Sequence, residues 1–347
     1  MSGGIAQLVA VGAQDAHLVG QPEVSFFRST YRRHTNFSQT TERQVIQGNV
    51  SNNGMSTVRF ERKGDLLNYV YFMPIKGDGT QANTVADWST AISKVELLIG
   101  GQVIDEQDSA FSTHIAPELL ATNLSKSVAG GIYRGGANEQ FYPLRFFFCE
   151  NWQSALPLIS LQYHDVELRI TWGPSAAIHK WECYANYAYL DTDERTVFAN
   201  KPQNILITQV QNAVASQAKI QELNFNHPIK FLASNTQASG LMTATNKVKL
   251  QINGTDVTDF KFASPNYSAV SSYYHVPFSS GDKKSSLFIY PFCLETSKLQ
   301  PTGSLNFSRL DSARIVSTEN NSLDKIYAVN YNVLRIENGM GGLMYSN

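Results

Sequence analysis

The stretch Leu156–Ile170, LPLISLQYHDVELRI, decides the fold of this chain. Its apolar residues Val166, Leu168 and Ile170 are separated by single charged residues. A period of two is the pattern of a β-strand that buries one face and exposes the other to solvent. The stretch therefore predicts a strand that packs against a second layer.

Three segments of the chain recur in the same order. The pairs are Lys94–Gly101 with Lys247–Gly254, Ser160–Tyr163 with Ser304–Phe307, and Asn186–Leu190 with Asn330–Leu334. The last two pairs share one offset of 144 residues, and an Arg-Ile dipeptide follows at 169–170 and again at 314–315. Chance similarity between strands is the alternative. Common order and spacing favour an internal duplication, in which Lys94 lies over Lys247 and Asn186 over Asn330.

Length and composition restrict the class of protein. At 347 residues the chain exceeds what one hydrophobic core usually serves, which predicts two domains. Apolar residues make up 42% and charged residues only 16%, so part of the surface is expected to be covered by partners. The net charge is −1, without the excess of Lys and Arg that direct binding of nucleic acid requires.

The cysteines and the N-terminus indicate the compartment. Three cysteines without a CxxC motif predict no disulfide framework, only buried thiols in a reducing environment. The first basic residue is Arg28, and glycines interrupt the apolar residues before it, so we expect no signal peptide. No run approaches the about 20 apolar residues of a membrane span. We expect synthesis in the cytoplasm.

Further along the chain, the pattern is almost entirely β. Strands are expected at Leu66–Ile75, Ile92–Ile99, Phe141–Phe148 and Trp181–Leu190, and short helices at Ala110–Ser127. Few helices and many short strands predict all-β sandwiches. We place an N-terminal arm at residues 1–21, a first eight-stranded sandwich at 22–200 and a second at 203–347.

Catalytic motifs are absent from the sequence. It has no GxGxxG, Walker, GxSxG or HExxH motif, and its seven histidines are scattered, so we expect no cofactor and no metal. His164, in the deciding stretch, is interpreted as structural. Asp191, Asp193 and Glu194 resemble a pair of glycosidase carboxylates or a calcium site, but carboxylates also cap turns and Arg195 follows for pairing. We therefore interpret them as structural and predict no enzyme.

Two sets of residues remain as candidate sites. Seven Asn-x-Ser/Thr sequons occur, of which Asn123, Asn253 and Asn266 are the candidate glycan attachment sites. The basic residues Arg28, Arg32 and Arg33 follow an apolar arm that has no core of its own. One hypothesis places this arm on the inner face of an assembly, with the arginines toward anionic lipid head groups or inner proteins. The alternative packs the arm on its own first sandwich, with the arginines in surface ion pairs.

Several segments together resemble one protein family. They are GGIAQLVAVGAQDAHLVGQPEVSFFRSTYRRHTNF (3–37), LPLISLQYHDVEL (156–168), LDTDERTVFA (190–199), LNFNHPIKFLA (223–233), LNFSRLD (305–311) and NYNVLRIENGMGGLMYSN (330–347). In this order they are similar to the recurring blocks of the major capsid proteins of large nucleocytoplasmic DNA viruses, of the phycodnavirus (algal virus) type. The loops are shorter here than in the chlorella-virus members, so glycan sites on loops do not carry over.

The resemblance implies a fold and a role. It implies a double jelly roll, assembled as pseudo-hexagonal homotrimeric capsomers that tile the outer icosahedral shell of a virion around an inner membrane. The implied partners are other copies of the chain, neighbouring capsomers, minor capsid proteins beneath the shell and the inner viral membrane, but not nucleic acid. Two other classes stay open: a carbohydrate-binding or -cleaving β-sandwich, and a minor jelly-roll component of the virion.

Overall fold

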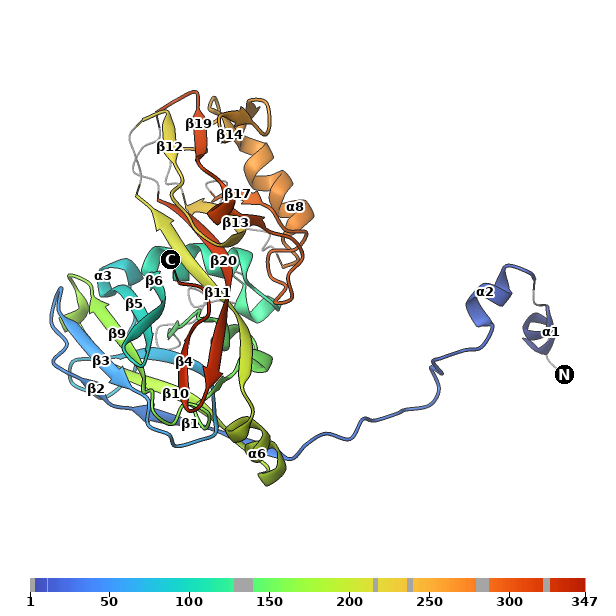
Figure 1. Cartoon of the computed structure of the whole chain (residues 1–347), viewed down its shortest axis with the longest axis horizontal. Helices are drawn as coiled ribbons and strands as arrows, with labels where there is room; N and C mark the ends of the chain where they lie inside the picture. Colours follow the sequence, from blue (N-terminus) through green and yellow to red (C-terminus); the bar gives the residue numbers. More distant parts are fainter. Residues whose placement is uncertain are drawn as a thin grey trace. The chain divides into compact units, whose positions relative to one another are not determined.

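A computed structural model describes residues 4–10, 12–127, 140–214, 218–235, 240–278, 287–320 and 325–346. The chain divides into two compact units, Met1–Asn36 and Phe37–Asn347. The first unit contains two short helices, α1 (Gly4–Val9) and α2 (Asp15–Val19), and α2 buries no residue. All the strands described below belong to the second unit (Figure 1).

The first half of the larger unit is a sandwich of two antiparallel sheets. One sheet has the order β1 (Phe37–Gln44), β10 (Lys180–Leu190), β4 (Leu66–Ile75), β7 (Tyr142–Pro143), and β8 (Leu156–Pro157) also pairs with β4. The facing sheet has the order β2 (Ile46–Gln47), β3 (Met55–Arg59), β9 (Val166–Trp172), β5 (Ile92–Ile99), β6 (Gln102–Asp108). We call this sandwich the first roll.

Strand β9, from the deciding stretch, lies in the middle of its sheet. Its side chains alternate between buried and partly exposed, with Val166, Leu168, Ile170 and Trp172 all facing the core. The indole nitrogen of Trp172 donates a hydrogen bond of 2.8 Å to the hydroxyl of Ser56, which satisfies a polar group inside an apolar layer. The predicted half-buried strand is confirmed.

The second half repeats the sandwich. One sheet has the order β11 (Gln203–Ala213), β20 (Ile326–Glu337), β13 (Pro228–Asn235), β17 (Leu287–Pro291), with β18 (Leu305–Asn306) on β13 and β21 (Met340–Leu343) on β20. The other has the order β12 (Ile220–Glu222), β19 (Ala313–Ser317), β14 (Lys247–Ile252), β15 (Thr255–Asp256), with β16 (Lys261–Phe262) also on β14. We call it the second roll.

The two rolls share one topology. The order β1-β10-β4-β7 corresponds to β11-β20-β13-β17, and β3-β9-β5-β6 corresponds to β12-β19-β14-β15. In each roll one strand is interrupted in the same way, since β7 and β8 both pair with β4 and β17 and β18 both pair with β13. Counting β1 with β2 and β7 with β8 in the first roll, and β15 with β16 and β17 with β18 in the second, and leaving aside the C-terminal β21, gives eight strands per roll, in the pairing order of a jelly roll. The all-β double jelly roll is confirmed.

The asparagines of the repeated segments lie in corresponding strands, while their residue-by-residue superposition stays a prediction. Asn186 in β10 lies opposite an edge-strand residue of β1, and Asn330 in β20 lies opposite an edge-strand residue of β11. Both asparagines are buried and hydrogen-bonded to that edge strand. The turns that follow β5 and β14 each hold two residues at positive φ, Gly100-Gly101 and Asn253-Gly254, as a tight hairpin turn requires.

Short helices occupy the connections. They are α3 (Trp88–Ala91), η1 (Phe111–Ile115), α4 (Ala116–Leu119), η2 (Leu124–Lys126), α5 (Phe147–Glu150), η3 (Trp152–Ser154), η4 (Ala176–Ile178), α6 (Thr192–Asn200), α7 (Ala263–Pro265), η5 (Asn266–Val270), α8 (Ser271–His275) and η6 (Phe307–Arg309). The expected helical pieces within Ala110–Ser127 are therefore present. The strand expected over Phe141–Phe148 is wrong beyond Pro143, because the segment turns into α5.

Candidate assembly surfaces

The joint between the two rolls is an apolar contact made by one insertion. The connection from β6 to β7 leaves the first roll as η1 and α4, and its residues Phe111, Ile115 and Leu119 pack on the outer face of the second roll's β13, β17 and β20. That face presents Phe231 and Val329, which pair directly across β13 and β20. Full burial of each such side chain contributes about 1.5–3 kcal/mol, so the joint holds the rolls firmly.

Polar groups of β6 complete the joint. Asp105 is buried, and one of its oxygens accepts backbone N–H groups from Val210 of β11 at 2.9 Å and from Glu106 at 3.0 Å. Burial raises the pKa of Asp105 to about 7, against the opposing effect of these donors. At the end of the same strand, Asp108 accepts a hydrogen bond of 2.6 Å from the hydroxyl of Tyr327, whose pKa rises because of burial and of this neighbouring carboxylate.

The C-terminal hairpin of β20 and β21 packs into the first roll. Leu334 and Ile336 belong to the first roll's core, together with Ile207 of β11. A Cβ atom added to Gly341 would lie 2.6 Å from a methyl group of Leu161, so only glycine fits between this hairpin and the deciding stretch. Nearby, the Nδ1 atom of His164 lies 2.9 Å from the carbonyl oxygen of Gly341, in agreement with the structural role expected for this histidine.

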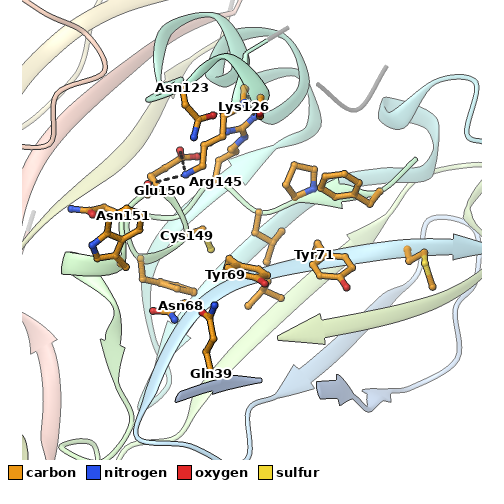
Figure 2. Close-up of a pocket in the computed structure, with 18 of the residues that line it drawn as sticks. Gln39, Asn68, Tyr69, Tyr71, Asn123, Lys126, Arg145, Cys149, Glu150 and Asn151 are labelled. Carbon is orange, nitrogen blue, oxygen red and sulfur yellow. Dashed lines mark hydrogen bonds and ion pairs between the residues drawn. The ribbon is translucent and has the colours of Figure 1, made fainter. Parts of the chain in front are cut away.

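The corresponding outer face of the first roll is uncovered by the described chain and carries a groove of about 740 Å³ (Figure 2). Its floor is the outer face of β4, where Tyr71 stacks on Tyr184 at 5.4 Å between ring centroids and meets Phe141 edge-on at 5.8 Å. Tyr69 and Phe141 are each more than two-fifths exposed, and Trp152 at the rim is 81% exposed. Exposed aromatic side chains around a hollow are typical of a binding surface.

The described charged groups of this groove, Lys126, Arg145 and Glu150, contact one another and together carry a net charge of +1. Arg145 and Glu150 form an ion pair of 3.1 Å with both side chains nine-tenths buried. Lys126 donates to the carbonyl oxygen of Glu150 at 2.9 Å, and its own carbonyl accepts from Arg145 at 3.2 Å. Burial raises the pKa of the Cys149 thiol to about 12, so this thiol is unreactive. The groove is therefore aromatic, rich in amides and without an unpaired carboxylate among its described residues.

The structure places the candidate glycan sites at turns. Asn123 is exposed at the rim of the groove and caps η2 by accepting the N–H of Lys126 at 2.9 Å. Asn253 is exposed in the hairpin turn after β14 and accepts the N–H of Asp311 at 2.9 Å. Asn266 begins η5 and is partly buried, with its amide nitrogen donating to a backbone oxygen at 2.8 Å. Each asparagine thus has a local structural role, and attachment of a glycan stays a prediction.

The acidic group does not form the pairing expected from the sequence. Asp191 is the N-cap of α6 and accepts the N–H of Thr192 at 2.7 Å, while Asp193 and Glu194 lie in the first turn, where the helix dipole favours negative charge. Arg195 pairs with Asp65 at 3.0 Å rather than with its acidic neighbours. The structural interpretation of the group agrees with this geometry, since Asp191 directly follows the end of β10 and caps a turn, which is the first turn of α6.

The structure also bears on the basic residues, on metal binding and on membrane spans. Arg28, Arg32 and Arg33 are exposed in the Met1–Asn36 unit. In the described part of the chain, no three His, Cys, Asp or Glu side chains gather into a potential metal site. Of the helices that the structure describes, none combines the length and the apolar character needed to cross a membrane.

The groove residues were not found from the sequence. They come from β4, from the residues just before β7, and from the segments around η2 and α5, which are far apart along the chain. The one available signal was the alternation Tyr69, Tyr71, Met73 in β4, opposite to the buried face of that strand.

Two family models match the chain. The model for the major capsid protein N-terminus matches residues 25–191, and the model for the large eukaryotic DNA virus major capsid protein matches residues 233–342. The chain is 36% identical to the major capsid protein of Pyramimonas orientalis virus and 33% identical to that of Paramecium bursaria Chlorella virus 1, each over the whole of both chains. A quasi-atomic model of the PBCV-1 virus capsid is similar in structure, with a TM-score of 0.76 and 29% identity, covering 93% of this chain and 100% of the other.

Proposed function

This chain belongs to the major capsid proteins of large eukaryotic DNA viruses, and we propose that three copies of it join side by side into a pseudo-hexagonal capsomer of the outer icosahedral shell. It is a structural protein of the virion, and capsid proteins of this family associate with copies of themselves. The observation that supports the proposed capsomer is the fusion of two like rolls across a buried joint. Three such chains present six similar rolls, which suits a hexagonal lattice.

The described site residues support a role without catalysis. The groove has the aromatic side chains that a carbohydrate site needs, but its carboxylate, Glu150, is held by Arg145. The second acidic group, at Asp191, caps a helix. Neither offers the pair of free carboxylates, one able to act as an acid, that glycoside cleavage requires. The duplicated roll also argues against a minor component built from a single jelly roll.

The proposal extends to the domain boundaries and to the partners of the N-terminal arm. We place an arm at residues 1–21, a first domain at 22–200 and a second at 203–347, with the arm on the inner face of the capsomer. There Arg28, Arg32 and Arg33 would meet minor capsid proteins or the anionic head groups of an inner membrane. The net charge of −1 suits a shell that does not contact the genome.

Mass in solution tests the capsomer. Light scattering on purified protein is expected to give three times the chain mass of 38.5 kDa. A monomer of 38.5 kDa at every concentration would contradict the proposal.

Deletion of residues 1–20 tests the arm. The shortened chain is expected to fold and to form trimers but to fail in building shells. If the isolated chain and its trimer instead lose the same amount of thermal stability, the arm belongs to the core of its own domain.

A further inference from the structure

The duplication extends to the helical insertions that follow β6 in the first roll and β16 in the second. In the first roll η1 passes directly into α4, and in the second roll η5 passes directly into α8, so each insertion is a five-residue π-helical turn followed by an α-helical turn. Counting from the start of each π-helical turn, Val270 occupies the place of Ile115, and Tyr274 occupies the place of Leu119. Figure 1 shows the first insertion between the rolls and α8 beside the strands of the second roll.

The two insertions differ in what covers them. Ile115 and Leu119 are completely buried against the second roll, as described above. Their counterparts are exposed, Val270 by 42% and Tyr274 by 72%, and the neighbouring Tyr273 by 77%. Mobility does not explain this exposure, because the insertion is anchored: Tyr267 is buried in the second roll's core, 5.3 Å from Phe288 between ring centroids.

The two receiving faces correspond as well. The first insertion packs on the outer face that contains the cross-strand pair Phe231 and Val329. On the outer face of the corresponding strands β4 and β10, the first roll holds the cross-strand pair Tyr71 and Tyr184, and Tyr71 lines the aromatic groove. The described chain therefore has one insertion without a receiving face and one receiving face without an insertion.

We propose that η5 and α8 of one copy dock in the first-roll groove of the next copy, by the contact that η1 and α4 make within the chain. This inference rests on the proposed capsomer and specifies its interface. A contact between two different surfaces is head-to-tail, and it closes into a ring where the rotation allows. Six rolls joined by one kind of step form such a ring from three chains.

The chemistry of the two surfaces is complementary. Tyr273 and Tyr274 lie edge-to-face, 5.0 Å apart between ring centroids, and present aromatic surface to a groove lined by Tyr69, Tyr71 and Phe141. Aromatic side chains are enriched in the buried centres of interfaces and dominate their binding energy. Among the described residues, the groove's carboxylate, Glu150, is paired with both Arg145 and Lys126, so this contact would bury no unpaired carboxylate there.

Cross-linking between copies tests the contact directly. A chain carrying both Tyr69→Cys and Tyr274→Cys, with the partly exposed Cys149 of the groove replaced by Ser, is treated with a short bis-maleimide, which cannot reach the buried Cys183 and Cys293. We expect covalent products that end at three chains on a denaturing gel, and products of two chains from a mixture of the two single variants. Cross-linking of Tyr274→Cys alone to itself would indicate a symmetric contact and overturn the proposal.

A substitution separates this contact from the capsomer as a whole. Tyr274→Asp and Tyr69→Asp, on the two opposing surfaces, are each expected to weaken trimer association at least about 30-fold, as for a residue that dominates an interface. The control Val257→Asp, at a similarly exposed site of the second roll, is expected to leave association unchanged. Trimers that persist in both tyrosine variants would refute the contact, assign the groove to another partner and leave the trimer standing. A wild-type monomer would refute both.

Discussion

Replacement of the buried carboxylate of Asp105 by an amide should change how stability depends on pH. Asp105 joins β6 of the first roll to β11 of the second, with one oxygen accepting two backbone N–H groups and the other accepting the side-chain amide of Gln107 at 2.8 Å. In Asp105→Asn the carbonyl oxygen keeps the two backbone donors. The new amide nitrogen faces the Gln107 amide, which also donates to the carbonyl oxygen of Arg145 at 2.9 Å and so is not free to turn.

The magnitude follows from the pKa of Asp105. Burial raises it from 3.8 to about 7 in the folded chain, so between these two values the folded chain holds a proton that the unfolded chain has lost. Stability from this group is therefore present below about pH 4 and is lost as pH rises toward 7. A pKa difference of about three corresponds to a loss of up to about 4 kcal/mol. The amide does not titrate and removes this loss, but two facing donors cost about 1–3 kcal/mol at every pH.

Denaturant unfolding of both proteins between pH 4.5 and 8 measures the effect. We expect Asp105→Asn to be less stable than the wild type at pH 4.5, and the difference to shrink or reverse by pH 8. Carboxylates elsewhere titrate equally in both proteins, so the difference between the two curves isolates Asp105. Parallel curves would show that the Asp105 carboxylate is ionised throughout, and would refute the argument from burial.

Four further substitutions test other parts of the structure. Leu119→Ala, in the joint, should lower the free energy of unfolding by about 2–5 kcal/mol, and a change below 1 kcal/mol would show that the joint is loose. Burial lowers the pKa of Lys230 from 10.5 to about 8 in the folded chain, so between these pH values the unfolded chain holds a proton that the folded chain has lost. The free energy of unfolding of the wild type should therefore rise from pH 8 to 10.5, and that of Lys230→Met should lack this rise. Asp191→Ala should cost about 1 kcal/mol through loss of a helix cap, which would be contradicted if Asp191→Asn cost as much. Gly341→Ala should lower the free energy of unfolding by about 1–3 kcal/mol, because the added methyl group overpacks against the deciding stretch. The control Gly342→Ala should cost less, because its methyl group meets only the end of a glutamine side chain at 3.3 Å. Equal melting temperatures of the two variants would contradict the close fit at Gly341.

The strands were predictable where one face of a strand is buried. The bounds expected for β4 and β5 agree with the structure, and β9 and β10 were found within two residues, because alternation or β-branched runs mark them. The segment Leu144–Phe148 was misread because it is buried on all sides, and a continuous apolar run does not distinguish a strand from a buried helix. Helix α6 was missed although Asp191 and the acidic residues after it are typical of a helix N-terminus.

The duplication was predictable in its elements and less so in its register. Pairing of β5 with β9 sets Leu97 opposite Leu168, and pairing of β14 with β19 sets Leu250 opposite Ile315. The Arg-Ile dipeptides at 169–170 and 314–315 are therefore displaced by two residues in the superposed sheets. A shift of two keeps each side chain on its own face, so the pattern survives while the alignment by letters fails.

The candidate site could be predicted least, because it depends on which surfaces the fold leaves uncovered. The outer face of β13 and the outer face of β4 are equivalent strand surfaces, yet the first is buried by an insertion from the other roll and the second is open. Nothing local distinguishes Phe231 from Tyr71 in the sequence except that one ring is wholly apolar and the other carries a hydroxyl. The first face is covered within the chain, and a tyrosine hydroxyl suits the second face, which the described chain leaves open to solvent.

The contacts at the joint run in both directions and lock the rolls together. The first roll contributes η1 and α4 to the outer face of the second, and the second contributes Leu334 and Ile336 to the core of the first. The first roll's core includes residues from the second half of the chain, and the second roll's outer face is covered by residues from the first half, so neither half is expected to fold alone. A fixed angle between the rolls is what a ring of six rolls requires, because an error at each joint would accumulate around the ring. In the proposed capsomer, these contacts in both directions would fix the angle between the two rolls, as closure of the ring requires.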